Sequence, residues 1–216
     1  MDVPVHFVRW KKTHRIIPVR QEGQRVFDKI GKSGDFEALD TLDQATREPR
    51  EIPRDHANET FRYQSESRFS DGTFGIYYAA KGLHTALKES IYHRELFLGD
   101  THQPPILVYS RLLLADVEGR FHDVRKLKKT MPHIYSPKRD DYRASQSLGS
   151  RLKEEGSAGI CYDSVRDPKG MCIAVFERSR ITHCHEERWF GYRWNGQQIS
   201  EVLELRSFLN FSKTKR

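Results

Sequence analysis

The chain has 216 residues, of which 37 are lysine or arginine and 30 are aspartate or glutamate, and its net charge is +7. No apolar run approaches the roughly 18 residues that a membrane-spanning helix needs, and the charged N-terminal stretch lacks the apolar segment of a signal peptide. The three cysteines form no CxxC pair and leave one thiol unpaired in any disulfide scheme, which favours reduced thiols. These features exclude the membrane, secreted and disulfide-scaffold classes and predict a basic, soluble, cytoplasmic protein.

The first quarter of the chain is predicted to be irregular and mixed. A short strand is expected over residues 6–10, apolar residues at helical spacing follow over 36–45, and the proline- and charge-rich stretch 46–53 is typical of a linker. We therefore assign residues 1–55 to an N-terminal extension.

The following residues alternate strands with two helices. Apolar and aromatic runs predict strands over residues 61–63, 74–80, 106–114, 159–162 and 172–176. Helical spacing predicts helices over residues 83–97 and 142–154, and Gly156 ends the second of them. Because strands dominate and the helices are inserted between them, the predicted fold class is α+β.

The C-terminal part carries the strongest short hairpin signal of the sequence. Asn195-Gly196 lies between two strand-like runs, which predicts that these runs pair with each other. We place the main domain at residues 56–190, and a hairpin strand with a basic tail at residues 191–216.

The basic residues are densest between residues 120 and 139, a segment that contains two prolines and lacks helical apolar spacing. Such a stretch is typical of a solvated loop, although a net charge of +7 also suits a nucleic acid, an acidic protein or an anionic small molecule. No zinc finger, helix-turn-helix or RNA-binding aromatic motif accompanies the charge, so direct nucleic-acid binding is not expected.

The predicted helix over residues 83–97 has three faces. Its apolar stripe consists of Leu83, Ala86, Leu87, Ser90, Ile91 and Phe97. A third face, apart from the apolar and polar ones, carries Thr85, Glu89 and Tyr92, so the Glu89 carboxylate can face a cleft. The competing interpretation is a partly exposed glutamate paired with Lys88 or His93, and the pattern alone favours it.

Three blocks of sequence resemble the RES domain family. They are SRFSDGTFGIYYAA at 67–80, TALKE at 85–89 and GICYDSVR at 159–166. The family is named for an arginine, a glutamate and a serine, which fall here on Arg68, Glu89 and Ser164. Its usual tyrosine, eleven positions before the glutamate, falls on Tyr78. Ser67 departs from the pattern, because many relatives carry glycine at that position.

The resemblance implies an ADP-ribosyltransferase-like fold of mixed, mostly antiparallel sheets with inserted helices. It also implies a toxin of a RES–Xre toxin–antitoxin system, which cleaves the nicotinamide–ribose bond of NAD+ by hydrolysis or phosphorolysis. NAD+ is then a substrate, no resident cofactor is expected, and the protein partner is an Xre-type antitoxin, while a homodimer stays open. Two alternatives remain, an ADP-ribosyltransferase that modifies a protein target and a basic nucleic-acid-binding module.

Two residues are expected to act in catalysis under this resemblance. Glu89 is expected to stabilise the positive charge that develops on the ribose as the bond breaks. Nicotinamide leaves as a neutral molecule, so one carboxylate suffices. Arg68 is expected to bind the pyrophosphate or a ribose edge through its paired donors, and the competing interpretation is a surface ion pair with Glu66.

Three further residues complete the predicted substrate contacts. Tyr78 can stack on nicotinamide or close the pocket wall, Ser164 offers a hydroxyl to the nicotinamide amide or the ribose, and Arg166 is a second anion contact. Each has a structural alternative, because Tyr78 suits a sheet core, Ser164 can cap a turn and Arg166 can be a surface charge.

No metal or redox cofactor site is expected. His183-Cys184-His185 carries metal-capable side chains, but in a strand the two histidines share one face while Cys184 points away, and no second ligand pair stands at zinc spacing. Neither a P-loop nor a GxGxxG motif is present.

Overall fold

The computed structural model describes residues 2–19, 56–62 and 64–205. Of these, residues 2–17, 56–62 and 64–205 belong to one compact unit. The predicted helical stretch at 36–45, the predicted linker at 46–53 and the basic tail lie outside the described residues.

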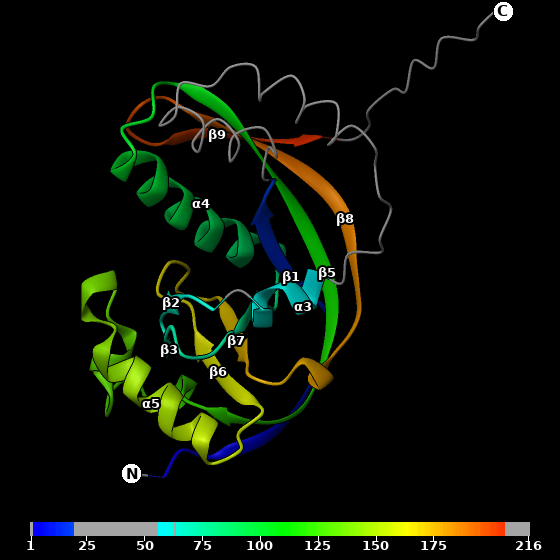
Figure 1. Ribbon diagram of the computed structural model, residues 1–216, viewed down its shortest axis with the longest axis vertical. Helices are drawn as coiled ribbons and strands as arrows, with labels where there is room; N and C mark the ends of the chain where they lie inside the picture. Colours follow the sequence, from blue (N-terminus) through cyan, green and yellow to red (C-terminus); the bar gives the residue numbers. More distant parts are fainter. Residues whose placement is uncertain (1, 20–55, 63, 206–216) are drawn as a thin grey trace, which may run out of the picture. The chain divides into compact units, whose positions relative to one another are not determined.

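A mixed sheet dominates the structure. Within the described residues it contains seven strands in the order β1-β4-β7-β6-β5-β8-β9 (Figure 1). Their bounds are β1 Val5–Pro18, β4 Tyr77–Ala80, β5 Ile106–Asp123, β6 Gly159–Asp163, β7 Met171–Val175, β8 Ile181–Trp194 and β9 Ile199–Leu205. β5 and β6 run parallel, whereas β4 with β7, β6 with β7, β5 with β8 and β8 with β9 are antiparallel. The prediction of an α+β, mostly antiparallel fold is confirmed.

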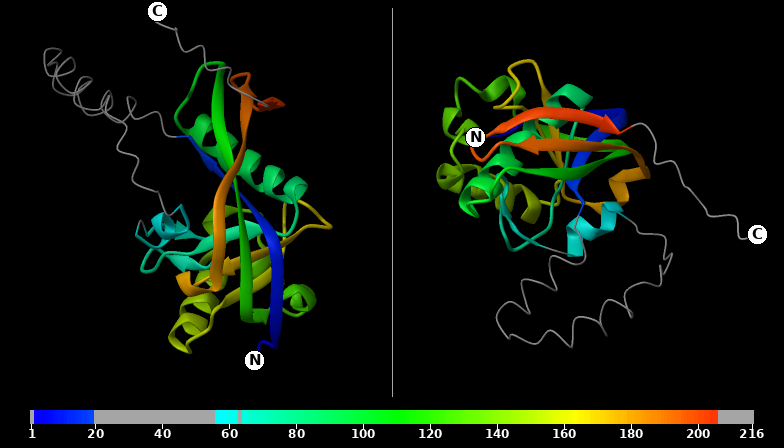
Figure 2. Two further views of the ribbon diagram at one scale, coloured as in Figure 1. Left: turned by 90° about the vertical axis from the view of Figure 1, so that its right-hand side faces the viewer. Right: turned by 90° about the horizontal axis from the view of Figure 1, so that it is seen from above.

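The first strand closes part of this sheet on itself. β1 pairs with both β4 and β5, and Figure 2 shows it running beside β5. Arg9 and Lys11 of β1 form ion pairs with Glu118 and Asp116 of β5, at 2.7 and 2.8 Å. The predicted strand over residues 6–10 is therefore longer than expected, because charges on its exposed face find partners across the strands. β1 thus belongs to the main sheet, and the domain boundaries at residues 55 and 190 stay predictions.

Helices α4 (Leu83–Asp100) and α5 (Arg143–Glu154) lie on the same side of the long β5–β8 pair (Figure 1). α4 packs its apolar side chains onto β5, β8 and β9, and α5 packs Leu148 and Leu152 onto a core that contains Tyr162 of β6. Through these contacts the two helices cover the sheet along most of its length.

Within the described ranges, no helix combines the length and apolarity needed to span a membrane.

Two details of the predicted elements are wrong. Phe61 lies in the helix α3 (His56–Arg62) and not in a strand, because it joins Ala57 in packing from the helix onto the core. Phe97 is 56% exposed and not part of the apolar stripe of α4, and the buried residue is Leu98. Leu98 follows Ile91 by two helical turns and therefore shares its face.

A short antiparallel pair, β2 (Glu66–Ser67) and β3 (Ser70–Asp71), carries Arg68 at its turn. α5 approaches this turn so closely that a Cβ at Gly149 would stand 1.9 Å from the carbonyl oxygen of Phe69. Only glycine fits at such a contact between two backbones.

We expect Gly149→Ala to lower the free energy of unfolding by about 1–3 kcal/mol, because α5 must move away from the Arg68 turn. Chemical denaturation followed by circular dichroism measures the change. Gly99→Ala is the matched control on a helix, since a Cβ at Gly99 meets nothing within 4 Å, and its effect is expected to be neutral or stabilising. Equal stability of the Gly149→Ala variant and the wild type contradicts the packing described.

Candidate functional site

The structure brings Glu89 of α4 into contact with Ser164, which directly follows β6. The Ser164 hydroxyl donates a hydrogen bond to Oε1 of Glu89 at 2.5 Å, and Ser164 is only 2% exposed. Its Oγ also accepts hydrogen bonds from the backbone N–H groups of Arg166 and Asp167, at 3.0 and 2.9 Å. Ser164 thus caps the turn, as the structural alternative predicts, and contacts the carboxylate at the same time.

Arg68 is buried and makes its hydrogen bonds to a single segment of the chain. Its guanidinium donates through Nη1 to the carbonyl oxygens of Ile134 and Ser136 and through Nη2 to the hydroxyl of Tyr142, each at 3.1 Å. It also lies 4.4 Å from the centroid of the Tyr142 ring. We call the segment that it holds the 132–142 segment, which contains the short 3-10 helices η2 (Pro132–Tyr135) and η3 (Arg139–Asp141).

The predicted alternative for Arg68, a surface ion pair with Glu66, is not what the structure contains. Arg68 is 8% exposed, and the Glu66 carboxylate instead accepts a hydrogen bond from the side chain of Gln146 at 3.0 Å. Glu66 lies in β2 whereas Arg68 lies in the turn after it, so strand alternation does not place the two side chains together. Arg68 therefore belongs to the interior of the site.

Tyr78 of β4 supports the turn that carries Arg68. Its hydroxyl donates to Oγ of Ser67 and accepts from the backbone N–H of Phe69, both at 3.0 Å. The side chain is half-buried against the core, and this burial raises the pKa of the phenol to about 12. Tyr78 is thus partly sheet core, and its polar end fixes both neighbours of Arg68.

These residues gather around the buried phenol of Tyr162. The Tyr162 ring lies 5.1 Å from that of Phe69, beside Arg68, and Tyr78 packs against the same core cluster. Burial raises the pKa of the Tyr162 phenol, Glu89 and Tyr78 raise it further, and Arg68 lowers it. Burial and then Glu89 raise the pKa of the adjacent Cys172 thiol, which Arg68 opposes. Residues from β4, α4 and the β2–β3 turn therefore meet at one place in the fold.

Arg166 links three elements at the edge of this group. Its guanidinium carbon lies 3.3 Å from the centroid of the Tyr92 ring on α4, and Nη2 donates to the carbonyl oxygen of Pro137. The Tyr92 hydroxyl donates to the same carbonyl at 3.2 Å. Arg166 is partly exposed, so it is a surface charge, as the structural alternative predicts, whose guanidinium is engaged by Tyr92 and Pro137. Its predicted contact with an anion stays a prediction.

The surroundings of His93 show that this edge is electropositive. His93 is an exposed residue of α4, and its partial burial together with Arg166, Arg139 and Arg68 lowers the pKa of the imidazole. The three arginines supply positive charge near this edge. Such an arrangement favours a negatively charged ligand.

Sequence reasoning did not predict the contacts of three residues that hold the site together. The sequence places Thr85 on the helix face of Glu89, Asp167 in a turn and Tyr142 at a helix start. It does not indicate that Thr85 donates a hydrogen bond to Asp167 or that Tyr142 accepts one from Arg68. Thr85 lies four residues before Glu89 on the same helix, and that spacing is the local signal that points to it.

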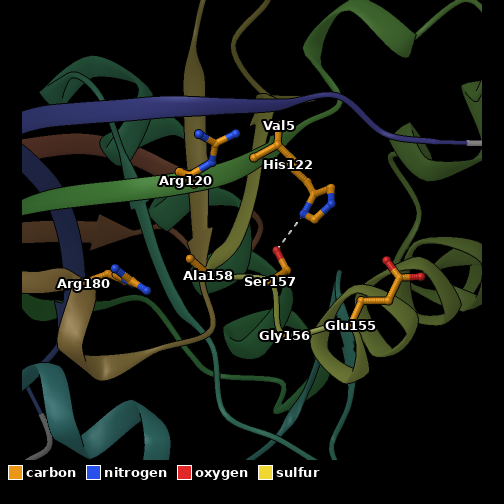
Figure 3. A pocket seen from close by; sticks show the side chains of 8 residues that line it. All are labelled: Val5, Arg120, His122, Glu155, Gly156, Ser157, Ala158 and Arg180. Carbon is orange, nitrogen blue, oxygen red and sulfur yellow. Dashed lines mark hydrogen bonds between the residues drawn. The ribbon is translucent and has the colours of Figure 1, made fainter.

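A hollow of about 270 Å³ lies apart from these residues. It is lined by Val5, Arg120, His122, Glu155, Gly156, Ser157, Ala158 and Arg180 (Figure 3). Figure 3 shows His122 turned toward Ser157, and the two side chains are hydrogen-bonded at 2.8 Å. Ser157 precedes β6 whereas Ser164 follows it, so the hollow and the motif residues lie at opposite ends of that strand. Its lining contains none of the predicted site residues.

The His183-Cys184-His185 sequence lies in β8 with both histidines exposed and Cys184 half-buried, which is the predicted alternation. Among the residues that the structure describes, no three histidine, cysteine, aspartate or glutamate side chains are grouped to hold a metal ion.

Comparison with known proteins places the chain in a family. The model of the RES domain matches residues 47–199. The uncharacterised protein y4oC of Sinorhizobium fredii is 28% identical over 204 residues, which cover 87% of this chain and 84% of that protein. The MbcT–MbcA toxin–antitoxin complex of M. tuberculosis contains a chain that matches with 12% identity and a TM-score of 0.45, covering 92% of this chain and 86% of that chain. The family model spans more than half of the sequence and includes Arg68, Tyr78, Glu89 and Ser164, and the chain belongs to the RES domain family.

Proposed function

We propose that this protein is an NAD+-degrading toxin that cleaves the nicotinamide–ribose bond, with Glu89 as the residue that stabilises the transition state. Membership of the RES domain family supports a toxin of a toxin–antitoxin system with NAD+-related activity. The observation that carries the finer proposal is the hydrogen bond from Ser164 to one oxygen of the Glu89 carboxylate.

This contact suits cleavage of an N-glycosidic bond. As nicotinamide leaves, positive charge develops on the ribose, and a carboxylate held beside it lowers the barrier. The Ser164 hydroxyl occupies Oε1 of Glu89, which leaves Oε2 for the ribose. Two backbone N–H groups donate to Ser164 Oγ, so its hydrogen is directed at the carboxylate and orients it. Nicotinamide departs as a neutral molecule, so the residues need supply no proton to it.

The arginines suit the pyrophosphate of the same substrate. Arg68, Arg139 and Arg166 all lie near enough to His93 to lower the pKa of its imidazole, so two phosphate charges entering there meet nearby positive charges. Three donor contacts of Arg68 are made to the 132–142 segment, and its proposed contribution is therefore to shape the site and to supply charge. Arg166 is the proposed direct contact with the anion, and Tyr78 is proposed to form one wall of the nicotinamide pocket.

The experiment is incubation of the purified chain with NAD+, with and without phosphate, followed by chromatography of the products. We expect free nicotinamide together with ADP-ribose for hydrolysis, or with a phosphorylated ADP-ribose for phosphorolysis. Labelled NAD+ that marks a protein band would instead indicate an ADP-ribosyltransferase. Absence of nicotinamide under every condition, from protein with a cooperative unfolding transition, contradicts the proposal.

An Xre-type antitoxin is the proposed partner, and the cytoplasm is the proposed location. NAD+ is the proposed substrate, and no resident cofactor is needed for its cleavage. Co-expression with a candidate Xre-type protein is expected to restore growth and to suppress nicotinamide release by the purified complex. Salt-sensitive binding to DNA or RNA that survives loss of both Arg68 and Glu89 would favour a nucleic-acid-binding module instead.

A further inference from the structure

We infer that Thr85 and Asp167 are positioning residues that set the contact between Glu89 and Ser164, an inference that rests on the proposed function. Thr85 lies on α4 and is 5% exposed, and Asp167 lies in the loop after β6 and is 8% exposed. The Thr85 hydroxyl donates a hydrogen bond to Oδ2 of Asp167 at 2.7 Å. This bond joins the helix of Glu89 to the loop of Ser164.

The two contacts are parallel links between the same elements. Thr85 precedes Glu89 by one helical turn, so both side chains leave the same side of α4. Asp167 follows Ser164 within one turn, and its backbone N–H donates to the Ser164 hydroxyl at 2.9 Å. The Thr85–Asp167 bond therefore holds the loop to α4 close to the point where Ser164 binds Glu89.

The loop itself is closed and packs directly on Thr85. Gly170 donates from its N–H to the Asp167 carbonyl at 2.8 Å, and its own carbonyl accepts from the Ser164 N–H at 2.9 Å. A Cβ at Gly170 would stand 2.5 Å from Cγ2 of Thr85. The threonine thus uses its hydroxyl to hold Asp167 and its methyl group to set the distance of the loop from the helix.

The charge of Asp167 strengthens this link. The hydrogen bond from Thr85 lowers the pKa of the Asp167 carboxyl, burial opposes the shift, and Lys88 lowers the pKa further. Nζ of Lys88 lies 3.4 Å from Oδ1. Asp167 is accordingly an anion at neutral pH, and loss of the Thr85 hydroxyl leaves Oδ2 of a nearly buried carboxylate without its donor, a costly state that movement of the loop can relieve.

The sheet and the helix do not need this bond to form. α4 is held to β5, β8 and β9 by Leu83, Leu87 and Ile91, and β6 is held by its ladders to β5 and β7. Removal of the Thr85 hydroxyl is therefore expected to leave the fold in place and to release the loop. A displacement of Ser164 on the scale of an ångström is enough to misorient Glu89 and to slow a reaction that depends on its position.

The test compares Thr85→Val with Thr85→Ser and with Thr13→Val. We expect Thr85→Val to lower kcat for nicotinamide release by about tenfold while KM for NAD+ stays within about twofold, because the group acts through Glu89. Thr85→Ser keeps the hydroxyl and is expected to retain kcat within about threefold. Thr13→Val is the matched control, because buried Thr13 also loses a 2.7 Å hydrogen bond, to the carbonyl of Ala115 in β5, and is expected to keep the wild-type kcat.

A second readout, amide exchange, does not depend on enzymatic activity, and a second variant tests the same bond from the side of the loop. The amide protons of Arg166 and Asp167 are expected to exchange faster with solvent in Thr85→Val than in the wild type, and not in Thr85→Ser. Asp167→Ala removes the acceptor from the other side, should match Thr85→Val in both readouts, and should add nothing to it in the double variant.

The inference is overturned if Thr85→Val and Asp167→Ala both keep the wild-type amide exchange and kcat. It is also overturned if Thr13→Val lowers kcat as much as Thr85→Val does. A wild-type protein that releases no nicotinamide contradicts the proposed function, and amide exchange then still decides whether Thr85 and Asp167 hold the Ser164 loop.

Discussion

Glu89→Gln is expected to lower the rate of nicotinamide release from NAD+ by about 10²–10³-fold. The amide keeps the size of the side chain and can still accept the hydrogen bond from Ser164, but it carries no negative charge to stabilise the developing cation. Because the substitution preserves the contact, KM for NAD+ is expected to change little, and the loss falls on kcat. Steady-state kinetics with chromatographic detection of nicotinamide measures both constants.

Glu95→Gln is the matched control for this variant. Glu95 lies on the same helix, and its carboxylate accepts a hydrogen bond from the backbone N–H of Ile199 at 2.7 Å, which an amide oxygen can also accept. Glu95 is not one of the residues around Tyr162, so the kcat of the Glu95→Gln variant is expected to equal that of the wild type. A Glu89→Gln variant that turns over NAD+ at the wild-type rate removes Glu89 from the mechanism.

Arg68→Lys is expected to lower both stability and activity although it conserves the charge. A lysine ammonium on a flexible stem cannot reproduce the planar fork that reaches Ile134, Ser136 and Tyr142 together. Loss of hydrogen bonds from a buried charged donor is expected to lower the free energy of unfolding by about 2–3 kcal/mol. The released 132–142 segment then no longer holds in place the Pro137 carbonyl to which Arg166 donates. Nicotinamide release is therefore expected to fall by about 10²-fold.

Chemical denaturation and the nicotinamide assay separate the two effects of Arg68→Lys. Arg180→Lys is the surface control, because Arg180 is exposed and pairs with Glu177 one helical turn earlier, and its effect on stability is expected to stay within about 0.5 kcal/mol. Tyr142→Phe removes only one acceptor and should lie between these variants. A fully stable and active Arg68→Lys protein contradicts the role assigned to the guanidinium.

Local patterns predicted most of the elements that form the site. The helix over residues 83–97 is α4, the helix over 142–154 is α5, and the hairpin at Asn195-Gly196 joins β8 to β9. Those predictions rest on spacing and turn residues, which act over a few positions. The strand predicted at residues 61–63 failed for the same reason, since a short aromatic run packs equally well from a strand or from a helix.

The sequence by itself determined the α+β class, the family, and four motif residues, Arg68, Tyr78, Glu89 and Ser164, because residue type and spacing are written along the chain. Only the tertiary structure decided what those residues contact. Arg68 binds the carbonyls of Ile134 and Ser136 and not the adjacent Glu66, and Asp167 binds a threonine of α4. These partners are far apart in the chain, and the order of strands in the sheet and the packing of α4 and α5 on it bring them within hydrogen-bonding distance.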